Sequence, residues 1–390
     1  MEQKSKLLPP TDPNGRRIYW LNRLNVERQD GSKEELYPTP EVIAVAIAKC
    51  SRFDTPFDQN VDDVSLEKAA EFHEKWVVGY GHASVAEHAT SSLAIENISQ
   101  IVLKHVIEDS RLASYTEKST RYQPFVRERM ITPPAIQRSV HAETYRQLID
   151  HLYALYQDAQ EPIMHLMKEW FPKANELTDH AYLAQIRAKT LDATRGILPA
   201  GYLTAVGMTA NARVWETVIS KLLSHPLEEA QSVGMELKRV LKGEEGTDPN
   251  IALREKPHPT LVKYAAHKPY ISNVLEEVRN VARDWIETDP PIASFDLPRA
   301  GTDRRAVMTR DDALAEVRIA AGLLTRISHR SYAEAYGYLC EKPIECERIV
   351  EASLANRGPY DTPPREFEHA QFQHEIMTDY GAWKDIQRHR

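Results

Sequence analysis

Amphipathic helical periodicity is the feature of this chain that most constrains its fold. Over residues 141–171 the apolar side chains recur at spacings of three and four, the pattern of a helix that buries one face. They are Tyr145, Leu148, Ile149, Leu152, Leu155 and Tyr156. Pro162 is expected to kink or end this helix. Similar stripes predict helices over 41–50, 65–78, 178–196, 215–243, 261–287, 311–325 and 332–339.

Strand signals are fewer than helix signals. The best are RRIYWLNRL at 16–24 and TSSLAIENI at 90–98, and in the latter Leu93 and Ile95 alternate with Ala94 and Glu96. Periodicity alone therefore predicts a helix-rich fold of the α+β class.

The composition is that of a folded globular protein. Of the 390 residues, 42% are hydrophobic and 27% are charged, values near the averages of folded domains. The net charge of −8 offers no general attraction for nucleic acid or for an anionic membrane, so we expect neither as a partner. A polyanionic ligand would have to be bound by a local cluster of arginines.

Two further features bear on the cellular compartment. The N-terminus lacks the apolar core of a signal peptide and no run of 18 apolar residues occurs, so we expect a cytoplasmic protein. The three cysteines, Cys50, Cys340 and Cys346, do not have the spacing of metal ligands. We expect them to be reduced thiols in the core.

The chain divides into two parts that resemble each other. A segment rich in Gly, Pro and acidic residues at 241–260 predicts a first domain at 16–243, a linker at 244–261 and a second domain at 262–390. The stretch EHATSSLAIENISQIVLKHVIEDSR (87–111) matches EHAQFQHEIMTDYGAWKDIQRHR (368–390) at both ends, which indicates a diverged tandem repeat. Because the first copy continues for more than 120 residues beyond Arg111, we expect the second copy to be incomplete.

A histidine-rich turn precedes the predicted strand at 90–98. His82 and His88 are six residues apart with no third ligand nearby, and His369 and His374 share this defect, so no metal site is expected. Small residues in the turn could present His82 and Ser84 to a ligand, with Glu87 fixing a donor. The alternative is a capped start of the strand.

A polar segment follows the next predicted helix. Ser99 has the position of an N-cap for a helix that carries Ile101 and Val102, and Arg111 falls near its end. The segment then supplies Ser114, Thr116, Glu117, Ser119, Thr120 and Arg121. Arginine and serine can bind phosphate oxygens and glutamate can accept from a ring N–H, so the segment suits a phosphorylated, ring-bearing ligand. The alternative is a solvated loop.

Four landmarks in the order of the chain resemble the flavin-dependent thymidylate synthase family. They are GHASVAEHA (81–89), SRLASYTEKSTRY (110–122), TRGILP (194–199) and NAR (211–213). The family has an upstream H-x-[ST]-x-x-E-H element, an Arg-His-Arg motif followed by a loop of the type S-x-N-E-x-S-x-R-Y, and downstream arginine elements. The resemblance implies an α/β fold with a mainly antiparallel sheet flanked by helices, and a site at a domain or subunit interface of a homo-oligomer.

The resemblance also implies roles for individual residues. Glu117, Ser119 and Arg121 match the loop that binds dUMP, and Arg195 matches a further dUMP-contacting arginine. Arg121 and Arg195 would stabilise charge on the uracil carbonyls and hold the phosphate, while Ser119 would position the substrate rather than attack it. The positions matching the flavin-binding elements are His82, Ser84, Glu87, Arg111, Asn211 and Arg213.

The chain departs from the family pattern in both copies. The first copy has Asp109-Ser110 where the family has Arg-His, and it has Leu222 near the position of another substrate arginine, with Lys221 adjacent. The second copy keeps Arg388-His389-Arg390 but has Pro363 and Arg365 at the positions of the upstream histidine and its Ser/Thr partner. Since each copy lacks what the other keeps, we hypothesise a composite site in which the two copies share the binding residues.

The resemblance implies transfer of a methylene group from methylenetetrahydrofolate to C5 of dUMP. Reduced FAD would supply the hydride and NADPH would reduce the flavin. The departures leave two alternatives open: a non-catalytic paralogue that binds nucleotide or flavin, and a different flavin- or nucleotide-dependent enzyme on the same scaffold.

Overall fold

The structure is a computed structural model, and it describes residues 21, 24–27, 32–50, 60–61, 64–80, 83–244, 258–281, 306–310, 312–359, 361–376 and 378–387. The chain forms two compact units. The first contains Met1–Asp289 together with Tyr380–Arg390, and the second contains Pro290–Asp379. The division therefore falls after the sequence-predicted linker, and the last helix returns to the first unit.

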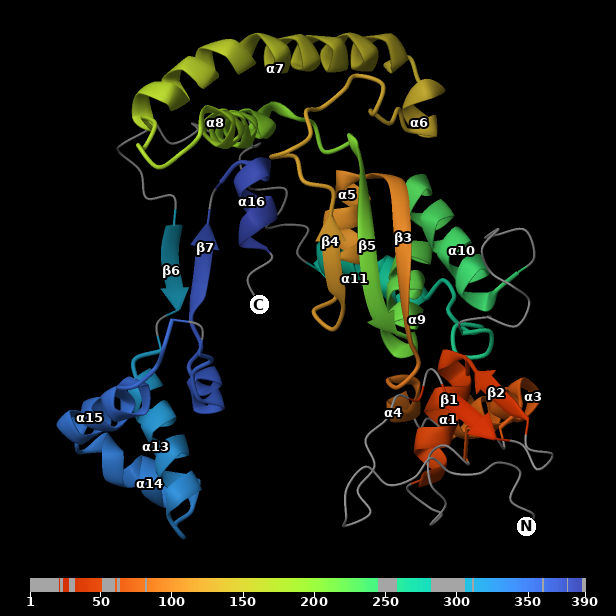
Figure 1. The fold of residues 1–390 in the computed structure, drawn as a ribbon, viewed down its shortest axis with the longest axis vertical. Coiled ribbons are helices and arrows are strands. Elements are labelled where there is room, and N and C mark those ends of the chain that lie inside the picture. The colour runs from red at the N-terminus through yellow and green to blue at the C-terminus, as the bar shows by residue number, and fades with distance from the viewer. Residues whose placement is uncertain are drawn as a thin grey trace. The chain divides into compact units, whose positions relative to one another are not determined.

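A three-stranded antiparallel sheet forms the centre of the first unit (Figure 1). Its strands are β3 (Thr90–Ser99), β5 (Leu203–Asn211) and β4 (Ser114–Glu117), with β5 between the other two. The strand predicted at 90–98 is confirmed. Asn97 has a φ of 57° at a register shift of β3, the left-handed region that Asn tolerates better than most residues.

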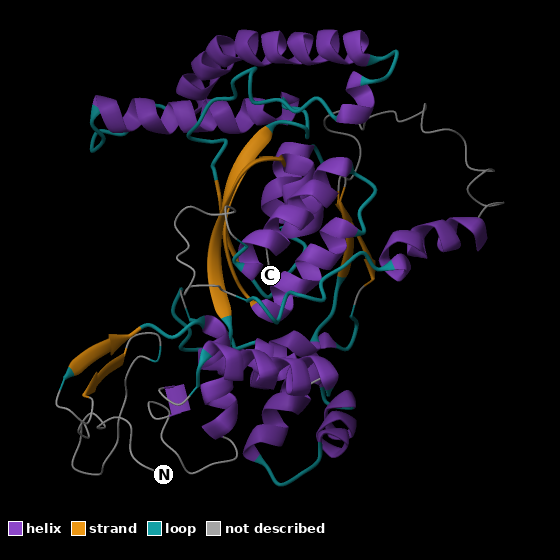
Figure 2. Cartoon of the chain, turned by 90° about the vertical axis from the view of Figure 1, so that its right-hand side faces the viewer, coloured by secondary structure: helices purple, strands orange, loops and turns teal. Residues whose placement is uncertain are grey.

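One face of this sheet packs against helices (Figure 2). They are α5 (Gln100–Val102), the π-helix η2 (Leu103–Ile107), α9 (Ala212–Leu223) and α10 (Glu228–Lys242). The core is centred on the fully buried Trp215. The predicted helix at 215–243 is two helices, because Pro226 cannot continue α9. Ser99 caps α5 as predicted by accepting from the Val102 N–H at 3.2 Å.

Two long helices extend beyond one end of the sheet. They are α7 (Ala142–Trp170) and α8 (Asp179–Thr194), preceded by α6 (Pro134–Gln137) and followed by the 3-10 turn η3 (Arg195–Ile197). Pro162 does not end α7, which bends in its C-terminal part (Figure 1). An aromatic cluster that includes Phe125, Tyr156 and Tyr202 joins the helix pair to the sheet.

The remaining elements of the first unit surround the other end of the sheet or pack on its helices. They are β1 (Leu24–Glu27), β2 (Lys33–Leu36), α1 (Pro40–Cys50), α3 (Leu66–Phe72), the π-helix η1 (His73–Gly79), α4 (Ala83–Ala86), α11 (Pro269–Val281) and α16 (Tyr380–Ile386). Most of the strand expected at 16–24 lies outside the described residues. The buried Glu41 accepts from the Thr260 and Leu261 N–H groups at 2.8 Å each, which attaches the segment after the predicted linker to the first unit.

The second unit is a small helical core with a two-stranded antiparallel ribbon. It contains β6 (Ala306–Arg310), α13 (Ala315–Ile327), α14 (Tyr332–Cys340), α15 (Pro343–Leu354), the 3-10 turn η5 (Arg365–His369) and β7 (Gln373–Ile376). Cys346 is a buried thiol as expected, whereas Cys340 is exposed, so the expectation of a core position is wrong there. The side chain of Cys50 is not described.

The order of elements in residues 365–386 is similar to that in 83–107. In each stretch a short helical turn is followed by a strand and then by a helix. This similarity agrees with the proposed repeat, which stays a prediction. No helix in the described part of the chain is long and apolar enough to span a membrane.

Candidate functional site

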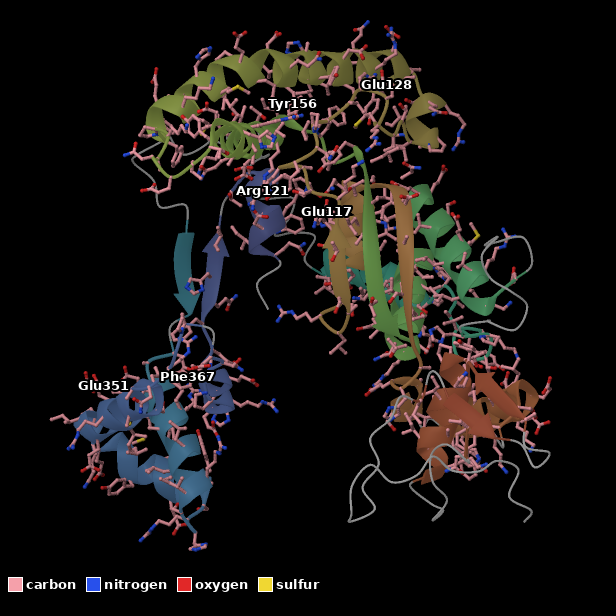
Figure 3. All side chains as sticks on the ribbon, viewed as in Figure 1. Glu117, Arg121, Glu128, Tyr156, Glu351 and Phe367 are labelled. Carbon is pink, nitrogen blue, oxygen red and sulfur yellow. The ribbon has the colours of Figure 1, made fainter. Side chains whose placement is uncertain are left out.

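The site lies where β4 ends and α16 packs against the same unit (Figure 3). The backbone of β4 pairs with β5 so that Glu117 lies opposite Val206, and the Lys118 N–H donates to the Ala205 carbonyl at 2.8 Å. The strand therefore carries Glu117 into the interior, while the residues after it lead out toward α8.

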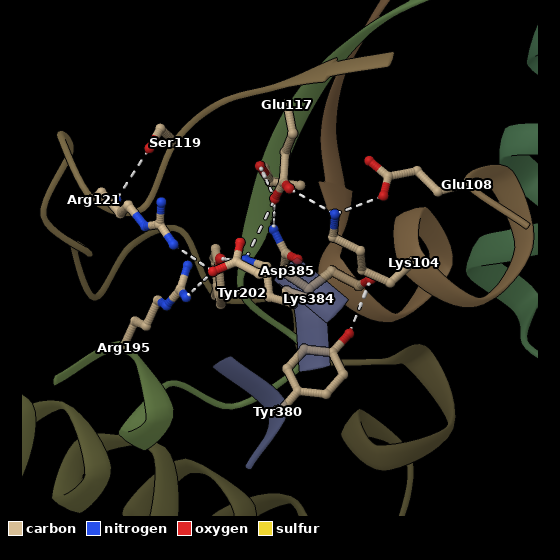
Figure 4. A network of polar contacts seen from close by, with 12 residues as sticks. Lys104, Glu108, Glu117, Ser119, Arg121, Arg195, Tyr202, Tyr380, Lys384 and Asp385 are labelled. Carbon is tan, nitrogen blue, oxygen red and sulfur yellow. Dashed lines mark hydrogen bonds and ion pairs between the residues drawn. The ribbon is translucent and has the colours of Figure 1, made fainter. Parts of the chain in front are cut away.

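Glu117 belongs to a buried cluster of two carboxylates and two lysines (Figure 4). Lys104 Nζ lies 2.8 Å from Glu117 Oε2 and 2.7 Å from Glu108 Oε2, and Lys384 Nζ lies 3.5 Å from Glu117 Oε1. Lys384 also donates to the Tyr202 hydroxyl at 2.7 Å. Since all four charged side chains are at most 7% exposed, each charge depends on its partners in the cluster.

The surroundings of Glu117 and Lys384 shift the pKa values of both side chains. Burial by itself would raise the pKa of Glu117, but Lys384 and Lys104 outweigh that effect and lower it. Burial lowers the pKa of Lys384 to about 8, although Glu117 acts in the opposite direction. Burial also raises the pKa of the Tyr202 hydroxyl. Glu117 is therefore a carboxylate at neutral pH.

Two arginines lie beside this cluster and share two carboxylates, of which Figure 4 labels Asp385. Arg121 follows β4, and Arg195 lies at the C-terminal end of α8. Asp192 Oδ1 is 2.8 Å from Arg121 Nε and 2.9 Å from an Arg195 terminal nitrogen. Asp385 Oδ2 is 2.6 Å from an Arg195 terminal nitrogen and also accepts from Arg121. The hydrogen bond to Asp192 raises the pKa of Arg121.

The two arginines differ in exposure. The side chain of Arg121 is 44% exposed and that of Arg195 is 10% exposed. Ser119 Oγ accepts from the Arg121 backbone N–H at 3.2 Å, which holds the turn that presents the guanidinium. Two guanidinium groups that converge on one oxygen form a site for an anionic group.

A cavity of about 650 Å³ opens next to the buried cluster. The ring of Trp383 is stacked on that of His105 at 5.0 Å between centroids with an interplanar angle of 16°, and on that of Tyr380 at 5.4 Å. The cavity is lined by Lys104, His105, Glu108, Asp109, Arg111, Ser114, Tyr115, Trp383 and Gln387. Its size and its ring-lined wall suit a planar organic ligand.

Several residues predicted to contact flavin lie at the other end of the sheet. Arg213 pairs with Glu87 at 2.5 Å, and Asn211 caps α9 by accepting from the Val214 N–H at 3.0 Å. Ser84 lies in α4, which Figure 1 shows at this end. His82 and the motif Arg388-His389-Arg390 lie outside the described residues.

The two ends of the sheet are well separated. Five residue steps along β5 separate Val206, which pairs with Glu117, from Asn211, which pairs with Thr90. At about 3.3 Å per residue this is roughly 17 Å, and the segment with Arg121 continues away from Asn211. The structure therefore brings together Glu117, Ser119, Arg121 and Arg195, but not Ser84, Glu87, Asn211 and Arg213 with them.

The residues that depart from the family motif have partners close by in the structure. Asp109, which replaces an arginine, forms an ion pair with Lys221. Leu222 is fully buried in the core, and Lys221 points to Asp109 rather than toward Arg121 and Arg195. A negative charge at 109 is thus matched by a positive charge on α9.

Sequence reasoning missed six members of the buried cluster and the adjoining arginine site: Lys104, Glu108, Asp192, Tyr202, Lys384 and Asp385. One signal was present, because Lys104 and His105 interrupt an otherwise apolar run from Ile101 to Ile107, and Lys104 has Glu108 four residues later. The others carry no local signal. In the part of the chain that the structure describes, no group of three or more His, Cys, Asp or Glu could hold a metal ion.

The fold and the site define a helix-rich α+β protein with a small antiparallel sheet and a polar, arginine-containing site at one end of that sheet. The chain belongs to the family of thymidylate synthase complementing proteins, whose family model matches residues 35–244. The resemblance to flavin-dependent thymidylate synthases is thereby confirmed.

Two relatives and one solved structure illustrate how similar this chain is to other proteins. A UPF0159 protein of Chlamydia pneumoniae is 30% identical over 337 residues, which cover 84% of this chain and 60% of that protein. The chain thus spans less than two thirds of the length of this relative. A flavin-dependent thymidylate synthase of Thermococcus onnurineus is 33% identical over 104 residues, covering 25% of this chain and 42% of the relative. The crystal structure of the Helicobacter pylori flavin-dependent thymidylate synthase complexed with FAD and dUMP covers 59% of this chain and 96% of its own, at 18% identity and a TM-score of 0.34.

Proposed function

We propose that this protein binds dUMP and FAD and converts dUMP to dTMP, with methylenetetrahydrofolate as the carbon donor and NADPH as the reductant. The observation that carries the proposal is the convergence of Arg121 and Arg195 beside the buried Glu117. Family membership and the order of the four sequence landmarks support the same ligand. We also propose that the protein is cytoplasmic.

The nucleotide would be held by the segment after β4. Arg121 and Arg195 would bind the phosphate or a uracil carbonyl oxygen, and Ser119 would donate its hydroxyl proton to a phosphate oxygen. Glu117 is held as a carboxylate by Lys104 and Lys384, so it would accept from a ring N–H rather than donate. Removal of water around these groups would strengthen each contact.

The ring-lined cavity fits the isoalloxazine part of FAD. Its volume is in the range of cofactor sites, His105 and Trp383 offer aromatic faces, and Arg111 adds a cation. When bound, reduced flavin supplies the hydride. The residues of this chain orient the ring against the nucleotide and limit the access of water.

A second copy of the chain would complete the flavin site. Ser84, Glu87, Asn211 and Arg213 lie toward the end of the sheet that is far from Glu117, and we propose that they contact the flavin of another subunit, as the family resemblance implies. We therefore propose a homo-oligomer with shared sites, as the family resemblance implies.

The C-terminal copy would supply the remaining basic residues. Helix α16 packs against the nucleotide segment through Lys384 and Asp385, and Arg388-His389-Arg390 follow it directly in the sequence. Arg388→Ala and Arg121→Ala should each abolish flavin or dUMP binding. If Arg388→Ala leaves both ligands bound, the composite site is wrong.

An absorbance titration tests the proposal. The purified protein is incubated with FAD, separated from free flavin and titrated with dUMP. Retained flavin bands that shift on addition of dUMP support a shared site, and formation of dTMP from labelled methylenetetrahydrofolate then tests the reaction. A protein that retains no flavin would refute the assignment.

Two observations favour a second candidate function, a non-catalytic protein that binds nucleotide or flavin. Asp109 has replaced a basic residue of the family motif, and the carboxylates of Asp192 and Asp385 already occupy the arginine pair. Flavin and dUMP binding without dTMP formation would identify this candidate.

A further inference from the structure

Asp385 occupies the position that an anionic ligand would take. A single oxygen of its carboxylate, Oδ2, accepts from both Arg121 and Arg195 (Figure 4). The contact joins residues 264 positions apart in the chain, so it exists only because α16 packs against the first unit. The proposed function assigns the same two guanidinium groups to the substrate.

We propose that Asp385 is an internal competitor for the anion site, which sets the affinity for a phosphomonoester and admits the ligand only when the Asp385 carboxylate turns away. This inference rests on the proposed function for the identity of the substrate. It makes Asp385 a specificity-determining residue that the family motif does not include.

The charges of the site support competition between the Asp385 carboxylate and a phosphate ligand. Two arginines and two aspartates leave the group formed by Arg121, Arg195, Asp192 and Asp385 without net charge. A phosphate dianion that approached this group would meet two carboxylates at short range. When Asp385 turns away, the remaining three residues carry one net positive charge and can accept the dianion. An uncharged nucleoside has no phosphate to pair with Arg121 and Arg195, so displacement of the Asp385 carboxylate would not favour its binding.

The exposed fractions of the side chains indicate that the Asp385 side chain can move while the rest of α16 stays in place. The side chain of Asp385 is 39% exposed, so its carboxylate can turn into water. The neighbouring Lys384 is 7% exposed and is held by Glu117 and Tyr202. Tyr380 donates to the Gln100 carbonyl at 3.3 Å, and Gln387 donates to Glu108 at 2.6 Å. These contacts keep the helix in place, so a change of the Asp385 side-chain rotamer is sufficient.

Two features separate Asp385 from Asp192, although both contact the same arginines. Asp192 lies three residues before Arg195, near the end of α8, so it contacts Arg195 from the adjoining segment of the chain. Asp385 comes from a distant segment and contacts one terminal nitrogen of each arginine. A carboxylate that binds terminal nitrogens through one oxygen imitates one oxygen of a phosphate.

The test measures binding of inorganic phosphate and of dUMP by calorimetry to the full chain and to Asp385→Asn. The variant keeps the shape of the side chain and removes its charge. We expect affinity for both ligands to rise at least fivefold. Asp385→Glu should keep the wild-type affinity, and Asp150→Asn is the matched control, because Asp150 pairs with Arg127 and Arg146 away from this site. Asp385→Ala replaces the asparagine variant if that variant fails to fold.

The outcomes separate the two proposals. Tighter binding of inorganic phosphate to Asp385→Asn, with dUMP no better than phosphate, supports the competitor and refutes the nucleotide assignment. Tighter binding of both ligands supports both. Unchanged or weaker phosphate binding in Asp385→Asn overturns the competitor. The rate at which phenylglyoxal modifies Arg121 gives an independent readout, because loss of the Asp385 contact should raise it in the variant and an unchanged rate would also overturn the proposal.

Discussion

The buried cluster around Glu117 allows a quantitative test by a double-mutant cycle. Glu117→Gln leaves Lys384 without a carboxylate partner, and Lys384→Met leaves Glu117 with only one lysine. Breaking one side of a buried ion pair costs about 3 to 5 kcal/mol. Because Lys104 still contacts Glu108 or Glu117 in each variant, we expect the lower limit, about 3 kcal/mol for each.

The double variant removes one charge of each sign. It should therefore lose much less than the sum of the single losses, and the coupling free energy should be about 2 to 3 kcal/mol. The physical reason is that the main cost of each single substitution is an uncompensated buried charge, which is absent when both partners are replaced.

Urea unfolding followed by tryptophan fluorescence measures this cycle. All six tryptophans fall within the sequence of the first unit and none within residues 290–379, so the signal reports the unit that contains the site. With a slope of about 2 kcal/mol per M, a loss of about 3 kcal/mol lowers the midpoint by about 1.5 M. Arg146→Ala is the control, because its pair with Glu143 is exposed and its midpoint should stay at the wild-type value. Single-variant losses that add to the double-variant loss within about 0.5 kcal/mol would refute the contact between Glu117 and Lys384.

Three further predictions follow from particular residues. Asn97→Val should lower the free energy of unfolding by about 1 to 2 kcal/mol, because its φ of 57° is unfavourable for a β-branched residue, while Asn97→Gly should stay near wild type in the same urea assay. Burial lowers the pKa of His258 to about 3, so below about pH 6.5 the unfolded chain binds a proton that the folded chain does not, and stability should fall as the pH decreases toward 3; His258→Gln should reduce this slope, and an identical slope would contradict the burial argument. Ser119→Ala should weaken dUMP binding about fivefold through loss of one hydrogen bond, with flavin reduction by NADPH retained, and complete loss of flavin reduction would contradict a positioning role.

Local patterns determined the secondary structure where one face of an element is buried. The strand at 90–98 and most predicted helices were identified because periodic burial leaves a periodic trace in the sequence. One predicted helix proved to be two, and the cause is also local. Pro226 divides a stripe whose apolar period continues on both sides.

The sequence by itself determined the family and predicted the residues of the proposed nucleotide loop, because those residues are contiguous and their types carry the chemistry. Only the tertiary structure decided that Lys384 compensates Glu117 and that Asp385 occupies Arg121 and Arg195. These partners are more than 180 residues apart, and no local period encodes such a distance. They meet because β4 carries a carboxylate into the interior, and a charge buried there requires an opposite charge, which the packing of α16 supplies.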